Sequence, residues 1–485
     1  MEEIKHKKVY WNICENCKGI GKIRKNVRKK TRLDYKKALD QFEKSNDEGT
    51  APIRPIGQLF TCSNCKGNGI VHSDEQPHID KENYPHIAII GGGIGGIALG
   101  VACLHRRIPF TLYERDSSFD TRSQGYGLTL QQASKAMAGL GILSLEKGLT
   151  STRHVVHTTD GNIIGEWGIR KWGRPDSKTS PKRTNVHIAR QSLRLELLQQ
   201  LGGHDAVKWG HQLVNFKESD GEPVHLNFQV HNEIKTVQAD LVVGADGIRS
   251  TVRKLLIGDK ITPLNYLGCI VILGVCPLEN LKDIESDLLD SSTVFQTANG
   301  NERIYMMPYD SHSIMWQLSF PLSEKKAIEL NMQGTKALKK EACLRTQWHA
   351  PIPQIVAATS ENQISGYPVY DRELLSPQLL KKDTKLTLIG DAAHPMSPFK
   401  GQGANQALLD ALELARGISK NCNSFSQWRK VGLKESVLNE FESDMIKRSA
   451  SKVKGSAEAA QLLHSEIVLY KSDGPRGKHR KIKNN

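Results

Sequence analysis

HIAIIGGGIGGIALGVACL, residues 86–104, predicts the fold of this chain more strongly than any other stretch. The apolar run Ile87 to Ile90 is typical of a strand that is buried in a parallel sheet. Glycines with the spacing G-x-G-x-x-G follow at Gly91, Gly93 and Gly96, and apolar residues then recur with helical period. A transmembrane helix is excluded, because glycine is too frequent and the flanking His and Arg residues leave too short an apolar span.

A second strand and an acidic residue complete this unit. The run FTLY, residues 110–113, ends at Glu114, which lies 18 residues beyond Gly96. The glycines permit a tight turn and close approach of the backbone to a pyrophosphate, and the carboxylate suits a ribose hydroxyl. Strand, glycine loop, helix, strand and acid in this order therefore predict a dinucleotide-binding unit.

The stretch IGDAAHPMSPFKGQGANQA, residues 389–407, is a second glycine-rich cluster, and it follows an apolar strand-like run. We expect the strand to end near Asp391 and a helix to begin near Gly403. Backbone N–H groups and a positive helix end would then point to one place, which suits an anionic or electron-rich group. An ordinary strand-to-helix turn explains a glycine or two, but not this density of glycines around Asp391 and Asn405.

Two shorter motifs lie between these clusters. The segment ADLVVGADGIRSTVR, residues 239–253, is typical of a strand, an Asp-Gly turn and the start of a helix. The segment VHIARQSLR, residues 186–194, opens a helix with apolar residues at Leu193 and Leu197. Asp-Gly alone usually indicates only a turn, so its meaning here comes from the motifs around it.

Taken in order, the motifs resemble the signature of the single-component FAD-dependent aromatic hydroxylases. This family includes para-hydroxybenzoate and salicylate hydroxylases and the tetracycline-inactivating monooxygenases. The similarity covers roughly residues 85–468. It implies an α/β fold in which a Rossmann-like FAD-binding domain of the GR2 type is interleaved with an antiparallel-sheet substrate domain. A C-terminal helix is also implied, and the stretch from Phe441 to Ser465 is similar to it.

The resemblance also implies roles for individual residues. The glycine loop is expected to face the FAD pyrophosphate, Glu114 the adenosine ribose and Asp391 a ribityl hydroxyl. Asp246 is expected to support the pyrophosphate loop, and the segment from Gly401 to Asn405 is expected to line the isoalloxazine ring. The carbonyl of Pro398 is expected beside the reacting edge of the flavin, and no catalytic side chain is assigned, because the flavin carries the chemistry. The full set of expected FAD contacts is Gly91, Gly93, Gly96, Glu114, Arg115, Arg190, Asp246, Asp391, Pro398, Gly401, Gly403, Ala404 and Asn405.

The activity implied by the resemblance is hydroxylation of a small aromatic or polyketide-like molecule. NADPH or NADH reduces FAD, the reduced flavin forms a hydroperoxide with O2, and one oxygen passes to the substrate. The chain carries no second dinucleotide fingerprint, which fits the family, where the nicotinamide has no domain of its own. Two other hypotheses stay open: another FAD-dependent oxidoreductase of this fold, such as a reductase or halogenase, or a zinc-dependent interaction protein with a secondary flavin body.

Four of the nine cysteines form a repeated pattern. The motif C-x-x-C-x-G-x-G occurs at Cys14 and Cys17 and again at Cys62 and Cys65. Two such loops can present four thiolates to one ion, so the sequence predicts one structural zinc, with disulfides or free thiols as the alternative. The repeats resemble those of the DnaJ-type zinc module. The role of this extension is open between docking a protein partner, dimerisation and stabilising the chain.

The composition favours a soluble cytoplasmic protein. Mean hydropathy is −0.44, and the sequence shows neither a secretion signal nor a membrane span. Thiolate zinc ligands and free thiols also favour a reducing compartment. The net charge is +15, and basic residues in the tail 471–485 predict disorder there. No aromatic residues interleave with these basic residues to stack on bases, so we do not expect a nucleic-acid partner.

These patterns predict a discontinuous domain organisation. The predicted parts are a zinc-binding extension (1–73), a linker (74–84), an FAD-binding domain (85–150, 184–205, 238–262 and 376–425), a substrate domain (151–183, 206–237 and 263–375), a C-terminal helical segment (426–470) and the tail (471–485). Alternation predicts a strand at Val224 to Val230 and a hairpin that pairs Ile304 to Met307 with Ser313 to Phe320. Tyr305, Met307, Met315 and Gln317 on this hairpin fit a substrate pocket and a sheet core equally well.

Overall fold

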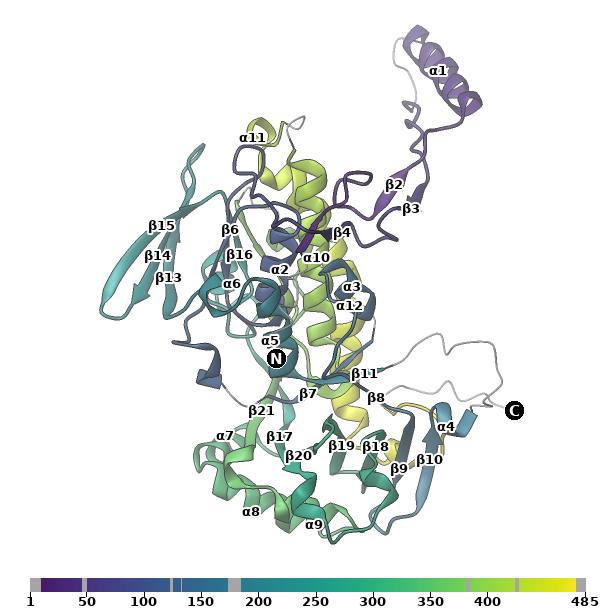
Figure 1. Cartoon of the computed structure of the whole chain (residues 1–485), viewed down its shortest axis with the longest axis vertical. Helices are drawn as coiled ribbons and strands as arrows, with labels where there is room; N and C mark the ends of the chain where they lie inside the picture. Colours follow the sequence, from purple (N-terminus) through teal and green to yellow (C-terminus); the bar gives the residue numbers. More distant parts are fainter. Residues whose placement is uncertain are drawn as a thin grey trace, which may run out of the picture.

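The computed structural model describes residues 10–45, 50–122, 125–131, 133–172, 185–380, 384–423 and 427–476. A parallel sheet lies in the upper half of the view in Figure 1 and a larger, mostly antiparallel sheet lies in the lower half. This combination confirms the predicted α/β fold class with interleaved parallel and antiparallel sheets. Among the described residues, no helix is both long enough and apolar enough to cross a membrane.

A five-stranded parallel sheet carries the glycine motifs. Its strands, in spatial order, are β12 (Val207–Lys208), β6 (Phe110–Tyr113), β5 (Ile87–Ile90), β16 (Leu241–Gly244) and β22 (Leu386–Leu388). The helices that follow β5, β16 and β22 are α2 (Ile94–Leu104), α6 (Thr251–Ile257) and α10 (Gly403–Asn421). Every residue of β5 and β16 is buried, as apolar strands with both faces covered should be. The carboxyl ends of the parallel strands meet at one edge, where a ligand site is expected.

A small three-stranded sheet lies next to this edge. It contains β7 (Gly127–Leu130), β11 (Val186–Ala189) and β8 (Leu149–Thr150), and the adjoining helices are α3 (Ser134–Gly139) and α5 (Arg190–Gln200). β11 pairs with β7 so that Ala189 lies opposite Gly127. Helix α5 therefore begins directly beside the start of β7.

The seven-stranded sheet forms the lower body of the protein. Its strands, in spatial order, are β10 (Ile163–Trp167), β9 (Arg153–His157), β18 (Thr293–Ala298), β19 (Arg303–Asp310), β20 (Ser313–Pro321), β17 (Asn265–Pro277) and β21 (Ile364–Asp371). One face packs against α7 (Glu324–Met332), α8 (Thr335–Arg345) and α9 (Ile352–Ala358). The predicted hairpin is confirmed, since Met307 of β19 lies opposite Met315 of β20. Only the β9–β18 pair among its ladders is parallel.

Residues 206–237 differ from the sequence-based expectation. The sequence assigns them to the substrate domain, but β12 joins the parallel sheet and the remainder forms a separate antiparallel sheet. Its strands are β13 (His211–Lys217), β14 (Val224–Val230) and β15 (Glu233–Ala239). β14 alternates buried and half-buried residues as predicted. Its inward face joins the core of the parallel-sheet domain, where Phe228 stacks on Tyr113 at 4.4 Å.

The C-terminal segment connects the two halves. Helix α11 (Trp428–Val431) and a π-helical turn (Lys434–Leu438) lead into α12 (Asn439–Leu462), which runs down to the seven-stranded sheet (Figure 1). The expectation of a disordered tail from residue 471 needs correction. Ser472 N donates to Ile164 O at 2.9 Å, and Asp473 accepts from the Glu166 N–H and pairs with Lys171, so this stretch packs on β10 and the neighbouring α4 (Ile169–Trp172). Residues 477–485 lie outside the described part of the chain.

The N-terminal extension contains two small two-stranded antiparallel sheets and one helix. Its elements are β1 (Tyr10–Ile13), β4 (Ile70–Ser73), β2 (Lys22–Arg24), β3 (Leu59–Thr61) and α1 (Lys29–Lys44). Helix α1 has no buried residue and points away from the body at the top right of Figure 1. The β1–β4 ladder lies instead against the body, beside α2 and α10.

Candidate functional site

A cleft opens at the carboxyl edge of the parallel sheet. Elements far apart in the sequence line it, because parallel strands end together at this edge. From the predicted set, the residues that line the cleft are Gly91, Gly93, Glu114, Arg115, Arg190, Asp246, Asp391, Gly403 and Ala404. Gly96, Pro398, Gly401 and Asn405 lie outside this lining.

The three glycines of the first motif meet different surroundings. Gly91 has φ +112°, and a Cβ there would lie 2.5 Å from the carbonyl oxygen of Ala245. A Cβ on Gly96 would lie 1.9 Å from the carbonyl oxygen of Gly91. A Cβ on Gly93 would meet no atom within 4 Å. Gly91 and Gly96 therefore allow the turn to close, whereas Gly93 leaves room at the start of α2 for a bound group.

Two side chains hold this loop in place. The Glu114 carboxylate accepts hydrogen bonds from the Gly92 N–H at 2.5 Å and the Asp116 N–H at 3.0 Å. Arg194 is buried, and its Nε donates to the carbonyl oxygen of Gly92 at 2.8 Å. The sequence analysis missed Arg194, although it follows Arg190 by one helical turn and that spacing on α5 was a usable signal. Glu114 thus orders the glycine loop in addition to its predicted contact with a ribose.

Asp246 serves as a cap for helix α6. Its carboxylate accepts from the Ser250 hydroxyl at 2.5 Å and from the N–H groups of Thr251 and Val252 at 2.7 and 3.2 Å. Burial raises the pKa of Asp246, while these hydrogen bonds act in the opposite direction. The predicted support of the pyrophosphate loop is therefore indirect in this geometry, since Asp246 fixes the start of α6.

Asp391 projects into the cleft from the turn after β22. Asp391 is exposed to the open cleft, but desolvation by the surrounding protein raises the pKa of its carboxyl group, while nearby His394 and Arg190 favour the charged form. Arg190 reaches the same region from the start of α5 and packs against Gly125. A carboxylate and a guanidinium thus line the same cleft, which suits the hydroxyl and phosphate groups of a nucleotide cofactor.

His394 belongs to a buried network and not to the cleft. Its Nε2 lies 2.7 Å from Asp410 Oδ2, and its exposed fraction is 1%. Asp410 also accepts from the Gly390 N–H at 2.9 Å and from Arg448 Nη2 at 2.9 Å. Burial disfavours the charged imidazole, but the Asp410 carboxylate outweighs it and raises the pKa of His394. The network ties the turn after β22 to α10 and α12, and no sequence motif indicates its two helical partners.

A second buried cation holds the same turn from the other side. Arg253 Nη1 donates to the carbonyl oxygens of Ala392 and Ala393 at 2.8 and 2.9 Å, and its Nη2 donates to Thr262 Oγ1 at 2.7 Å. Burial lowers the pKa of Arg253 to about 10, so the side chain stays charged at neutral pH. The sequence analysis missed this role, because main-chain carbonyls leave no signature in the residue order.

The start of α10 is fixed by Asn405. Its Oδ1 accepts from the N–H groups of Gln131 and Ala133, and its Nδ2 donates to the carbonyl oxygens of Thr129 and Gly401 at 2.9 and 2.8 Å. This side chain joins α10 to the end of β7. The contact of Gly401, Asn405 and Pro398 with an isoalloxazine ring stays a prediction.

The sheet face opposite α7–α9 points at β7. Arg303, Tyr305 and Met307 alternate along β19 and share this face. Met307 lies against Gly127, where a Cβ would be 2.7 Å from Met307 Cε, and Met315 Sδ accepts from the Gly127 N–H at 2.9 Å. Of the four hairpin candidates, Met307 and Met315 therefore pack on the wall that carries the cleft residue Leu128.

Arg303 is a further residue on this face that the sequence analysis missed. Its exposed fraction is 5%, its Nε donates to Gln296 Oε1 at 2.8 Å, and its guanidinium lies 4.9 Å from the Tyr305 ring centre. Burial lowers the pKa of Arg303 to about 10, so it remains a cation. No carboxylate of the described residues lies within ion-pair distance of it. Ser319 lies opposite Arg303 in the β19–β20 ladder, and its Oγ forms a hydrogen bond with His464 Nε2 at 2.9 Å. The His464 ring in turn contacts the ring of Phe399, one residue after Pro398.

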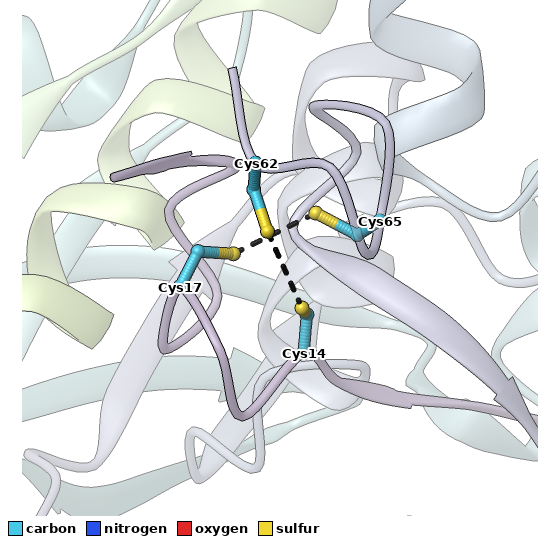
Figure 2. Close-up of side chains that lie close together, drawn as sticks. All are labelled: Cys14, Cys17, Cys62 and Cys65. Carbon is cyan, nitrogen blue, oxygen red and sulfur yellow. Dashed lines mark hydrogen bonds between the residues drawn. The ribbon is translucent and has the colours of Figure 1, made fainter. Parts of the chain in front are cut away.

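The four predicted metal ligands come together in the extension. Figure 2 shows that Cys14, Cys17, Cys62 and Cys65 point to one centre from two loops, and their sulfur atoms all lie within 4.8 Å of one another. The Sγ–Sγ distances are 3.9 Å for Cys14 and Cys62 and 3.6 Å for Cys17 and Cys65. A tetrahedral zinc with Zn–S bonds of about 2.3 Å separates its sulfurs by about 3.8 Å. All four cysteines are free and buried, so the geometry fits an ion better than disulfides.

Backbone N–H groups complete the shell around these sulfurs. Gly21 N donates to Cys17 Sγ at 3.1 Å, and Gly69 N donates to Cys65 Sγ at 3.2 Å. Both glycines have positive φ, +79° and +81°, which explains the last glycine of each repeat. Donors to sulfur stabilise thiolates and orient them, as partners of metal ligands do.

Comparison with known proteins places this geometry in a family. Residues 85–427 match the family described as FAD binding domain. Aurachin C monooxygenase/isomerase of Stigmatella aurantiaca is 30% identical over 335 residues, which cover 69% of this chain and 80% of that protein. The 6-methylsalicylate 1-monooxygenase of Aspergillus terreus is 25% identical over 411 residues, 78% of this chain and 83% of that protein. The fold also matches the structure of Klebsiella pneumoniae HpxO complexed with FAD and uric acid, with a TM-score of 0.63, 20% identity, and coverage of 79% of this chain and 90% of that one.

Substitution of two glycines should separate cofactor binding from folding. Gly93→Ala places a methyl group only in the open space of the cleft, so we expect a folded protein with FAD affinity reduced about 10- to 100-fold. Gly96→Ala drives a methyl group into the Gly91 carbonyl, so we expect a loss of about 1–3 kcal/mol in the free energy of unfolding. Flavin titration and denaturant unfolding measure the two effects. Unchanged FAD affinity in Gly93→Ala would contradict the binding of FAD at this glycine loop.

Asp410→Asn should make stability less dependent on pH. The folded pKa of His394 is raised, so its stabilisation is complete below its unfolded pKa of about 6.5 and is lost as pH rises through the folded value. The variant loses this contribution, which is part of the roughly 3–5 kcal/mol expected for breaking a buried pair. Thermal unfolding should therefore show a larger difference from wild type at pH 6 than at pH 9. Glu440→Gln, whose exposed side chain pairs with Lys420, is the control, and a pH-independent difference would contradict the charged pair.

Proposed function

Because this chain belongs to the FAD binding domain family, we propose that it is an FAD-dependent monooxygenase that acts on a small aromatic or polyketide-like molecule. It would use NADPH or NADH and O2 as co-substrates. The observation that carries the proposal is a cleft in which the glycine loop, Asp391 and the start of α10 meet. This cleft lies beside the face of the seven-stranded sheet that α7, α8 and α9 do not cover. The two curated relatives reported above are named as monooxygenases, and this chain matches 80% and 83% of their lengths.

The residues of the cleft fit FAD. Gly93 and the start of α2 would hold the pyrophosphate, since nothing fills the space above that glycine. Arg190 and Asp391 would hold the ribityl and phosphate groups, and the N–H groups at Gly403 and Ala404 would meet the ring system at a helix start. When bound, FAD supplies the acceptance of hydride and the activation of oxygen. The chain's own residues bind, orient and keep water out.

The charge of Arg303 narrows the expected substrate. A buried guanidinium without a carboxylate partner costs free energy unless an anion approaches it. It lies on the sheet face that points at β7, in the cluster that reaches Phe399 through His464. We therefore expect a substrate with a carboxylate, phenolate or enolate oxygen that pairs with this side chain.

The extension would hold one structural zinc through Cys14, Cys17, Cys62 and Cys65. Four protein sulfurs leave no open coordination position, so the ion would stabilise the fold and take no part in the reaction. Thiolate ligands persist in a reducing compartment, which supports a cytoplasmic location. Elemental analysis of the purified protein should give one zinc per chain, and Cys17→Ser should remove it; zinc retained at one per chain in that variant would contradict the assignment.

Aerobic oxidation of NADPH by the FAD-loaded protein tests the proposed activity. The panel consists of phenol, salicylate, salicylamide, a 4-quinolone and a tetracycline, each compared with no addition. We expect at least one compound to stimulate NADPH consumption and to yield a product heavier by one oxygen atom, as detected by mass spectrometry. Bound FAD that NADPH reduces with no such product would favour another oxidoreductase of this fold.

Arg303→Gln provides the matched control within the same assay. Salicylate and salicylamide differ mainly in one charge, so their ratio of kcat/KM reports an anion contact. We expect the wild type to prefer salicylate and the variant to lose about 10- to 100-fold of the activity toward acids, as removal of a charged hydrogen bond of about 1.5–3 kcal/mol predicts. An unchanged ratio would show that Arg303 has only a structural role.

A further inference from the structure

The zinc module is attached to the body through the far ends of two helices. Its two knuckles, defined as residues 14–21 and 62–69, present main-chain carbonyl groups to the C-terminal end of α2 and to the last turns of α10. Figure 1 shows this part of the extension beside α2 and α10, whereas α1 stands clear of both. The contacts below decide what this attachment does.

Arg106 ties both knuckles to α2. The residue follows the helix by two positions, and its side chain is completely buried. Its Nε donates to the Gly19 carbonyl oxygen at 3.1 Å and its Nη2 to the Asn68 carbonyl oxygen at 3.2 Å. Its Nη1 donates back to the Ala102 carbonyl oxygen within α2 at 3.1 Å. One guanidinium therefore binds one loop from each cysteine repeat and the helix end at once.

Helix α10 makes an equivalent attachment through two side chains that are three residues apart and share one face of the helix. Arg416 Nη2 donates to the Gly67 carbonyl oxygen at 2.8 Å. Ser419 Oγ donates to the Lys18 carbonyl oxygen at 2.9 Å. Both acceptors lie within two residues of a cysteine ligand, so the positions of these carbonyls depend on how the sulfurs are held.

Charge supports a metal centre at this interface. Zinc with four thiolates carries a formal charge of −2, the sum of one dication and four anions. Arg106 is a buried cation with no carboxylate within ion-pair distance among the described residues. Arg416 is a second cation at the knuckles, and its other terminal nitrogen pairs with Glu413 at 2.9 Å. Disulfides or neutral thiols would leave Glu413, which lies beyond ion-pair distance of Arg106 and is half exposed, as the carboxylate that offsets the buried charge. An anionic zinc centre offsets the cost of burying this cation.

The other ends of the same helices form the FAD cleft. Helix α2 begins at Ile94 and α10 begins at Gly403, and both residues line the cleft. The helices contain 11 and 19 residues, so about 16 and 28 Å separate their two ends at about 1.5 Å per residue. They pack closely near the cleft, where a Cβ on Gly95 would lie 3.3 Å from the Ala407 Cβ. A change of tilt at the knuckles therefore moves the groups that hold FAD.

We propose that the zinc module is a brace that couples the metal to the flavin site. Zinc orders the knuckles, the knuckles fix the far ends of α2 and α10 through Arg106 and Arg416, and the fixed helices hold the cleft in its FAD-binding shape. Binding of zinc and FAD then strengthens each other by the same factor, because such coupling is reciprocal. This inference rests on the proposed FAD and zinc sites, and it gives the extension a task within its own chain.

The test measures FAD affinity in the full-length protein with and without zinc. The flavin-free protein is prepared in zinc-loaded and chelator-treated forms, and each is titrated with FAD by flavin fluorescence. We expect zinc removal to weaken FAD binding by about tenfold, within the range of roughly 5- to 150-fold typical of coupled sites. Reciprocally, saturating FAD should raise the zinc affinity by the same factor, as measured by equilibrium competition with a chelator.

Arg416→Ala separates the brace from the metal site itself. The variant keeps all four cysteines, so we expect one zinc per chain together with FAD binding weakened by about fivefold. Lys420→Ala is the matched control, because it removes one positive charge from the same helix and its described ion pair is with exposed Glu440. The control should bind FAD as the wild type does.

The outcomes distinguish this proposal from the function it rests on. Equal FAD affinity with and without zinc, even with a lower melting temperature, overturns the coupling while the flavin assignment stands. If the chelated protein aggregates, Arg416→Ala decides, and wild-type FAD affinity in that variant overturns the brace. A zinc-loaded protein that binds no FAD contradicts the proposed function itself. A purified protein that contains no zinc overturns the role of the metal in the brace.

Discussion

The close approach of Gly96 to the carbonyl oxygen of Gly91 sets the geometry of both the cleft and the interface with the extension. A Cβ at position 96 would lie 1.9 Å from the carbonyl oxygen of Gly91, which is a severe clash. Only glycine therefore lets α2 follow β5 at this angle. That angle places the start of α2 in the cleft and its far end against the knuckles. It also brings Gly95 against Ala407 and so sets how α10 packs on α2. One close approach of backbone to backbone therefore positions the FAD cleft and the interface with the extension.

Buried arginines fix the loops around this centre, and most of them act on main-chain carbonyls. Arg194 binds Gly92, Arg253 binds the turn after β22, and Arg106 binds both knuckles. A guanidinium can donate five hydrogen bonds in one plane, so it can hold several carbonyls that no other side chain could satisfy together. Arg303 differs, because its Nε donates to the side chain of Gln296 and not to a main-chain carbonyl. It is the buried cation on the face where a substrate is expected.

Parts of the site could not be anticipated from the sequence. The network of His394 with Asp410 and Arg448 joins residues from a turn and two helices, and no short-range spacing links them. Residues 206–237 alternate like any half-exposed sheet, and the packing of Phe228 on Tyr113 decided which domain they join. A basic tail predicts disorder, yet backbone bonds to β10 order its first residues.

The amino-acid sequence alone predicts the family, the α/β class and the order of strand, loop and helix around each glycine motif. It also specified the four cysteines, because glycine spacing and ligand spacing are local properties of the chain. Long-range packing instead sets which loops meet, how the buried charges are compensated and where the extension docks. These features depend on main-chain carbonyl groups, which every residue carries, and on the orientation of helices, which long-range packing sets. Neither leaves a recognisable pattern in the sequence.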